Sequence, residues 1–163
     1  MLVSAALAAA VLGACGSSGS DGGSDQFRDQ TKSALLDFGE EGSKSALEEG
    51  AEVVQGFFAA RAEGDWAGTC AQLSRSVLDK IKHLATTATG LVDTSCPSFL
   101  GAFMRLSAEE RKESTIVDAG SLREQGPRAF LIYYGGSEAV YTMPLNREGS
   151  EWKIASLSPK QLN

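Results

Sequence analysis

Hydrophobic residues recur every three or four positions between residues 45 and 63, which is the spacing of an amphipathic helix. Ser45 and Glu48 lie three residues apart at the start of this stretch and match a capping box. We expect a core-facing helix of about 18 residues, with Gln55 and Arg61 on its polar face. Its inward stripe is predicted to contain Leu47, Ala51, Val54, Phe57, Phe58 and Ala62.

Shorter helical segments are predicted after this helix. Gly64 should end the long helix and Asp65 should cap the next one, since these residue types favour those positions. A further helix follows Ser74, and a last one begins at Pro97, a favoured first helical position. That last helix is expected to bury Phe99, Leu100, Phe103, Met104 and Leu106.

Four apolar-rich runs follow residue 112 and are typical of strands: ESTIVDAGSL, PRAFLIYY, SEAVYTMPL and SEWKIASL. Turn residues at 123–126, 135–136 and 147–150 separate them, which suits an antiparallel meander. The second run is apolar on both faces and is therefore expected at the centre of the sheet. Pro144 would cost a ladder hydrogen bond unless it lies at an edge or a bulge. This order of elements predicts an α+β fold, with N-terminal helices packed on a curved antiparallel sheet of about four strands.

The first fifteen residues carry a different signal. The apolar run LVSAALAAAVL is too short to span a bilayer as a helix. It ends in Leu12-Gly13-Ala14-Cys15, which resembles the lipobox of bacterial lipoproteins, although no Lys or Arg precedes the run. The resemblance implies a signal peptide over residues 1–14 and a diacylglyceryl group on Cys15, which would anchor the chain stably. The alternative is an Ala-rich N-terminal helix with a chance cysteine.

The segment after Cys15 is rich in Gly, Ser and acidic residues and has too few apolar residues to form a core. We expect a flexible tether over residues 15–44, in which Leu35, Leu36 and Phe38 form either one docked helical turn or part of the linker. The folded domain is then expected over residues 45–163.

Composition and charge exclude several classes of function. The net charge is −6 and the predicted pI is near 4.8, and the basic residues are scattered, so we expect no nucleic-acid partner. His83 is the single histidine, and with no second histidine beside it we expect no metal site. No glycine-rich loop opens a helix after a strand, and no cofactor is predicted.

Two cysteines remain besides Cys15. An even pair in an oxidising, exported compartment predicts a disulfide between Cys70 and Cys96. A redox-active thiol pair is the alternative, but the chain has no Cys-x-x-Cys motif and no adjacent base that would lower a thiol pKa.

The order of elements is similar to the nuclear transport factor 2-like superfamily, and especially to small actinobacterial lipoproteins of that class. The stretches that carry the resemblance lie between about residues 46 and 157 and are FFAARAEGDWAGTC, Cys96-Pro97, AFLIYY and WKIASL. The family fold implies a sheet bent around the long helix into a cone that can bind a small apolar molecule. Candidates to line such a pocket are Phe57, Trp66, Phe103, Tyr133, Tyr141 and Met143.

Three functions remain open from the sequence. The first is a non-enzymatic, lipid-anchored domain on the outer face of the cytoplasmic membrane, binding a small apolar ligand or a cell-envelope protein. The second is an isomerase or polyketide cyclase, which requires a buried carboxylate within hydrogen-bond reach of a tyrosine in the cone. The third is a structural accessory domain that forms a homodimer through its sheet.

Overall fold

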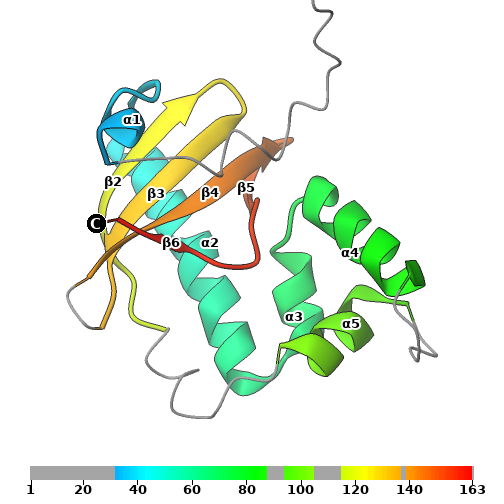
Figure 1. Ribbon diagram of the computed structural model, residues 1–163. Helices are drawn as coiled ribbons and strands as arrows, with labels where there is room; N and C mark the ends of the chain where they lie inside the picture. Colours follow the sequence, from blue (N-terminus) through cyan, green and yellow to red (C-terminus); the bar gives the residue numbers. More distant parts are fainter. Residues whose placement is uncertain (1–31, 88–93, 105–114, 137–138, 163) are drawn as a thin grey trace, which may run out of the picture.

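The computed structural model describes residues 32–87, 94–104, 115–136 and 139–162, which form an α+β fold as expected (Figure 1). The predicted signal peptide and Cys15 lie outside these residues. The elements in chain order are α1 Lys32–Leu36, β1 Glu40–Glu41, α2 Lys44–Glu63, α3 Trp66–Ala71, α4 Arg75–Thr87, α5 Cys96–Phe103, β2 Asp118–Gln125, β3 Arg128–Tyr134, β4 Val140–Glu148, β5 Glu151–Ile154 and β6 Lys160–Gln161. No helix among the described residues is long and apolar enough to cross a membrane.

The described strands form one antiparallel sheet in the order β1-β2-β3-β4-β5, and β6 also pairs with β4. The four predicted runs correspond to β2–β5, and β3 is central as expected. The strands β1 and β6 were not predicted, because each has only two residues and no alternating pattern. The turns are shorter than predicted: Gly126 and Pro127 join β2 to β3, and Gly149 and Ser150 join β4 to β5.

Pro144 lies within β4 opposite Phe130 of β3. Its carbonyl accepts a hydrogen bond from the backbone N–H of Ala155 at 2.9 Å. In an antiparallel strand the N–H and the C=O of one residue point toward the same neighbouring strand. Because the carbonyl of Pro144 points away from β3, the N–H that proline lacks would also have pointed away from β3. On that side β4 pairs first with β6 and then with β5, and Pro144 stands between the two. The proline therefore lies at a break in the pairing and costs no bond to the central strand.

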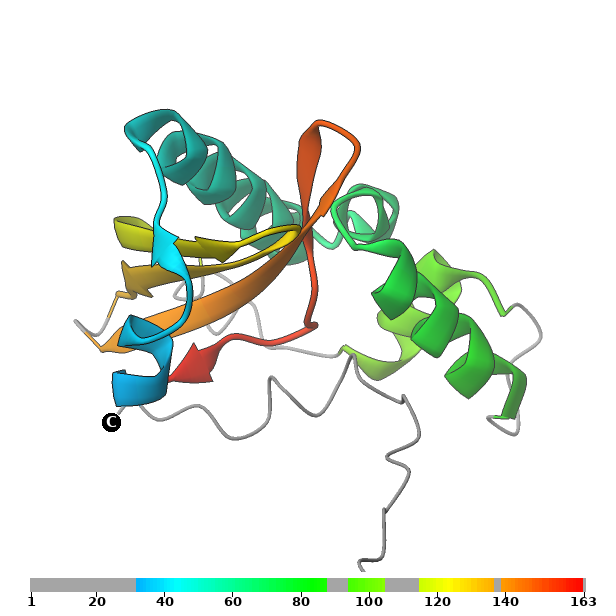
Figure 2. The same ribbon diagram turned by 90° about the horizontal axis from the view of Figure 1, so that it is seen from above.

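Helix α2 covers one face of the sheet, and α1 lies on the opposite face (Figure 2). Gly50 makes the close approach of α2 possible, because a Cβ there would lie 3.2 Å from Leu145 Cδ1 and 3.3 Å from Leu122 Cδ1. The N-cap is Ser43, whose side chain accepts a hydrogen bond from the Ala46 N–H, so the expected start at Ser45 is wrong by two residues. Helix α2 ends at Gly64 in the left-handed conformation, as predicted.

The segment around α1 docks on the sheet rather than extending away from it. Leu35 is fully buried, and the ring of Phe38 meets the ring of Phe130 edge to face at 4.8 Å. The guanidinium of Arg123 donates to the carbonyls of Phe38 at 3.1 Å and Gly39 at 2.7 Å. Residues 32–43, left open between a linker and a docked turn, thus form the outer layer of the described fold.

Helices α3, α4 and α5 form a group beside the sheet (Figure 1). Asp65 caps α3 by accepting a hydrogen bond from the Gly68 N–H at 2.8 Å, as predicted. The disulfide between Cys70 and Cys96 joins α3 to α5 and confirms the predicted pairing. Phe103 at the end of α5 is 57% exposed, contrary to the expectation that it faces inward.

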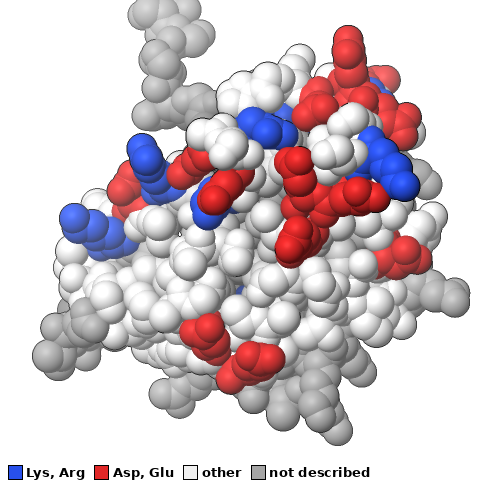
Figure 3. Space-filling model, turned by 180° about the vertical axis from the view of Figure 1, so that it is seen from behind, with Lys and Arg blue, Asp and Glu red and all other residues white. Residues whose placement is uncertain are grey.

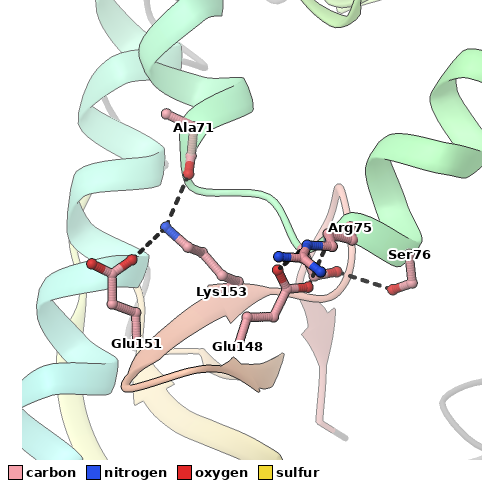
Figure 4. Close-up of polar contacts among 7 residues, drawn as sticks. Ala71, Arg75, Ser76, Glu148, Glu151 and Lys153 are labelled. Carbon is pink, nitrogen blue, oxygen red and sulfur yellow. Dashed lines mark hydrogen bonds and ion pairs between the residues drawn. The ribbon is translucent and has the colours of Figure 1, made fainter.

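The β4–β5 hairpin holds this helical group through polar contacts (Figure 4). Glu148 accepts a hydrogen bond from the backbone N–H of Arg75 at 2.7 Å, at the first residue of α4. Lys153 donates to the carbonyl of Ala71 at 3.3 Å and pairs with Glu151 at 2.9 Å. Leu73 forms a parallel bridge with Ile154 of β5. The sheet therefore fixes the start of α4 and the end of α3.

Candidate functional site around Arg61

The most unusual side chain among the described residues is Arg61 on α2. Its side chain was expected on the polar face of the helix, but the residue is only 6% exposed. It completes the buried stripe of α2, which consists of Ala46, Gly50, Val54, Phe57, Phe58 and Arg61. Val54, Phe57 and Phe58 were predicted in this stripe, whereas Ala46, Gly50 and Arg61 each precede the predicted residue by one position. A charged residue therefore occupies a core-facing position.

Aromatic rings surround the guanidinium of Arg61. Its central carbon lies 5.4 Å from the ring centroid of Phe57 and 5.8 Å from that of Phe58, within the range of cation–π contacts. One terminal nitrogen, Nη1, donates to the carbonyl of Leu157 at 3.3 Å. The Nε atom is buried and has no hydrogen-bond partner. Within the part of the chain that the structure describes, no Asp or Glu pairs with this cation.

Two tyrosines on the sheet complete the cluster. The ring of Tyr133 on β3 lies 6.2 Å from Phe58 and stacks on Tyr141 of β4 at 5.7 Å. Burial raises the pKa of Tyr133 well above its usual range, Tyr141 raises it further, and the charge of Arg61 opposes the shift. Burial lowers the pKa of Arg61, and Tyr133 opposes that change. At neutral pH the site therefore combines a charged guanidinium with a neutral phenol that can donate a hydrogen bond.

The structure brings together some of the predicted pocket residues but not all. Phe57 and Tyr133 contribute to the Arg61 site together with Tyr141, while Met143 is fully buried in the same hydrophobic core. Trp66 is half-buried on α3 and packs beside Gly101 of α5. Phe103 is exposed, and its ring lies tilted against that of Phe99 with the ring centroids 4.7 Å apart. Sequence reasoning missed Arg61 and gave Phe58 only a packing role, although Val54, Phe57, Phe58 and Arg61 follow helical spacing.

The other polar groups and the groove among the described residues are weaker candidates for a functional site than Arg61. Thr142 Oγ1 and Trp152 Nε1 are buried without partners, but neither group carries a charge. A shallow groove of about 400 Å³ beside β1 is lined by Gly39, Glu40, Glu41, Glu124, Gln125 and Gly126. Among the described residues, no three His, Cys, Asp or Glu side chains are grouped to hold a metal ion. His83, the single histidine, is exposed on α4.

Charged side chains are unevenly distributed over the surface. Figure 3 shows the face seen from behind Figure 1, where Asp and Glu side chains gather toward one end together with several Lys and Arg side chains. Much of the remaining described surface on this face is uncharged. The visible Lys and Arg side chains stand among acidic ones and form no continuous basic surface on this face.

Comparisons of the chain with protein-family models, with curated proteins and with solved structures find no match.

Proposed function

We propose that this chain is an exported, lipid-anchored domain of the nuclear transport factor 2-like type that binds a small apolar molecule between α2 and the sheet. The observation that carries the proposal is the Arg61 site, where a buried polar side chain ends an otherwise apolar layer. Small-molecule sites are typically apolar and aromatic with a few polar groups that orient the ligand. Phe57, Phe58 and Tyr133 form the apolar surroundings of the site, and Arg61 supplies the orienting group. Because these three rings are at most 3% exposed, we expect binding to require α2 and the sheet to move apart.

Binding fits these residues better than acid–base catalysis does. A cofactor-free isomerase needs a carboxylate within hydrogen-bond reach of the reacting proton. Apart from burial, the groups that shift the pKa of Tyr133 are Tyr141 and Arg61, and no carboxylate is among them. In the described part of the chain the site therefore offers a cation and a phenol but no general base. We propose a binding domain rather than an enzyme.

The binding of an apolar molecule can be tested with methionine methyl groups as reporters. The chain has three methionines, Met1, Met104 and Met143. Met143 is fully buried in the core beside Leu131, whereas Met104 is half-buried at the end of α5. In a spectrum of the chain labelled with ¹³C-methyl methionine, 4-phenyl-1-butanol should shift the Met143 signal saturably and leave Met104 unchanged. An unmoved Met143 signal would refute binding in this layer.

The lipid anchor is tested separately. Radiolabelled palmitate should label the full chain when it is expressed in a bacterium that processes lipoproteins, and Cys15→Ser should abolish the label. Cys70→Ser is the matched control and should keep it, because Cys70 forms the disulfide with Cys96 and has no part in the lipobox. Equal labelling of the Cys15→Ser variant and the parent chain would disprove the anchor.

A further inference from the structure

We propose that the exposed side of α5, together with the lysines of the neighbouring α4, binds the surface of an anionic lipid bilayer. Phe99 and Phe103 enter the region between headgroups and acyl chains, and Lys80 and Lys82 are attracted to the lipid phosphates. The inference goes beyond the proposed function, because it concerns a surface separate from the Arg61 site and does not depend on a lipid at Cys15.

The first argument is the apolar surface that α5 leaves exposed. The helix has the sequence CPSFLGAF, without a charged residue, and Leu100 is its one fully buried side chain. Phe103 is 57% exposed and Phe99 is half-buried, and their rings lie on the same side of the helix with centroids 4.7 Å apart. Leu84 on α4, which packs against α5, is also more than half exposed. Large apolar side chains exposed on neighbouring helices are typical of a protein or membrane interaction surface.

The second argument is charge, which distinguishes between these partners. Helix α4 contains three basic residues, Arg75, Lys80 and Lys82, and one acidic residue, Asp79, although the chain as a whole has a net charge of −6. Arg75 pairs with Glu148 at 3.7 Å, whereas Lys80 and Lys82 are exposed and form no ion pair within the described part of the chain. Free lysines beside exposed aromatic rings are typical of helices that lie on anionic membranes.

The distribution of acidic residues favours the same orientation. Glu40–Glu41 form β1, and Glu48 and Glu49 lie in the first half of α2, at the end of the molecule distant from α4 and α5 (Figures 1 and 2). An anionic bilayer repels that end and attracts the lysines, so it turns α5 toward the membrane. An anchor at Cys15 is compatible with this orientation, because a chain as long as residues 16–31 can span at most about 50–55 Å, and a small domain is about 30 Å across.

The experiment uses the full chain with Cys15→Ser, so that no lipid anchor takes part. Lipid nanodiscs of equal parts phosphatidylglycerol and phosphatidylcholine contain a trace of lipid with a nitroxide on its headgroup. In the chain labelled with ¹³C-methyl methionine, the nitroxide should broaden the signal of Met104, which is half-buried at the end of α5. Tyr134→Met adds a second surface reporter at the end of β3, away from α4 and α5 (Figure 1), and its signal should broaden much less.

Two variants in this background test the two kinds of contact. The double variant Lys80→Gln, Lys82→Gln should weaken docking by roughly tenfold or more, because each lysine near an anionic surface favours binding about fivefold. Phe103→Ser should weaken docking by about tenfold, since its ring then no longer leaves water. Lys44→Gln is the control for charge and should have little effect, because Lys44 lies at the start of α2 and pairs with Glu48.

Each outcome bears on the proposal. Greater broadening of Met104 than of the methyl group at position 134, lost in the double lysine variant, supports it. Equal broadening at the two positions overturns it, as does equal Met104 broadening in nanodiscs of phosphatidylcholine alone. If Phe103→Ser does not fold, the lysine variant decides, since it changes only exposed side chains. A dimer in lipid-free solution that Phe103→Ser disrupts, measured by analytical ultracentrifugation, would assign this surface to a second copy of the chain and overturn the proposal.

Discussion

Removal of the disulfide should destabilise the helical group formed by α3, α4 and α5 more than the sheet. Cys70 in α3 and Cys96 in α5 are separated by 26 positions, and α4 lies within the closed loop. From the entropy of loop closure, a bridge of this span stabilises the folded chain by about 3.5 kcal/mol. For a domain of this size, that loss lowers the melting temperature by roughly 10–15 °C. The perturbation is the double variant Cys70→Ala, Cys96→Ala.

The loss should be local because α5 depends on its neighbours in the helical group. It packs mainly on α3 and α4 among the described elements, and Gly101 of α5 contacts the ring of Trp66 on α3. Leu100 is its one fully buried side chain, and Phe103 is exposed. The sheet face under α2, by contrast, contains fully buried residues of several strands, such as Leu131. Without the disulfide, α5 should therefore open at a lower free energy than β3 does.

Hydrogen exchange measured by mass spectrometry separates these effects. Peptides that cover α5 should exchange much faster in the double variant, while peptides that cover β3 should keep most of their protection. All measurements belong in a Cys15→Ser background, which removes the third thiol and prevents exchange with it. Reductant should reproduce the effect in the parent chain and do nothing to the double variant. Equal loss of protection in α5 and β3, or a melting temperature that falls by less than about 3 °C, would refute the reasoning.

Three further predictions concern the sheet and α2. Glu148→Ala removes the hydrogen-bond acceptor at the start of α4 and should lower the free energy of unfolding, measured by urea titration, by about 1 kcal/mol. Glu151→Ala in the same hairpin is the control and should change little, because that side chain is exposed. Gly50→Val should destabilise the chain by about 1–3 kcal/mol, but Gly56→Ala should stabilise it by about 0.5–1 kcal/mol, because only Gly50 faces tightly packed side chains. Burial raises the pKa of Tyr133, so the stability that this neutral phenol contributes is present below about pH 10 and is lost as the pH rises further. Tyr133→Phe should flatten this alkaline decline in thermal melts, and an unchanged slope would contradict the assignment.

Features governed by local chemistry were predicted well from the sequence. Gly64 and Asp65 end one helix and begin the next because their preferences depend on the backbone of a single turn. The disulfide between Cys70 and Cys96 followed from counting the cysteines that remain after Cys15. The alternation of β3 also placed its two faces correctly, with Leu131 in the core shared with α2 and Phe130 on the other face against Phe38, which follows α1.

Features that depend on distant partners were not predictable in the same way. The two residues of β1 carry no apolar pattern, and their place at the sheet edge follows from pairing with β2 and from the hydrogen bonds of Arg123 to the preceding loop. Strand β6 similarly depends on the half of β4 that β5 leaves free. The N-cap of α2 was predicted at Ser45, two residues too late; Ser43 is the same residue type, and only the fold selects it.

Arg61 is a different kind of disagreement between pattern and structure. Its position, four residues after Phe57, belongs to the buried stripe, and only its charge argued for the opposite face. The helical period was thus correct, and the assumption that a charged residue faces solvent was wrong. A natural sequence usually makes local preference and burial agree, and exceptions concentrate where function requires them. An apolar residue at position 61 would complete the core without an unpaired donor, so the presence of arginine there calls for a benefit outside the packing. A polar group that orients a bound molecule, as we propose for Arg61, is such a benefit.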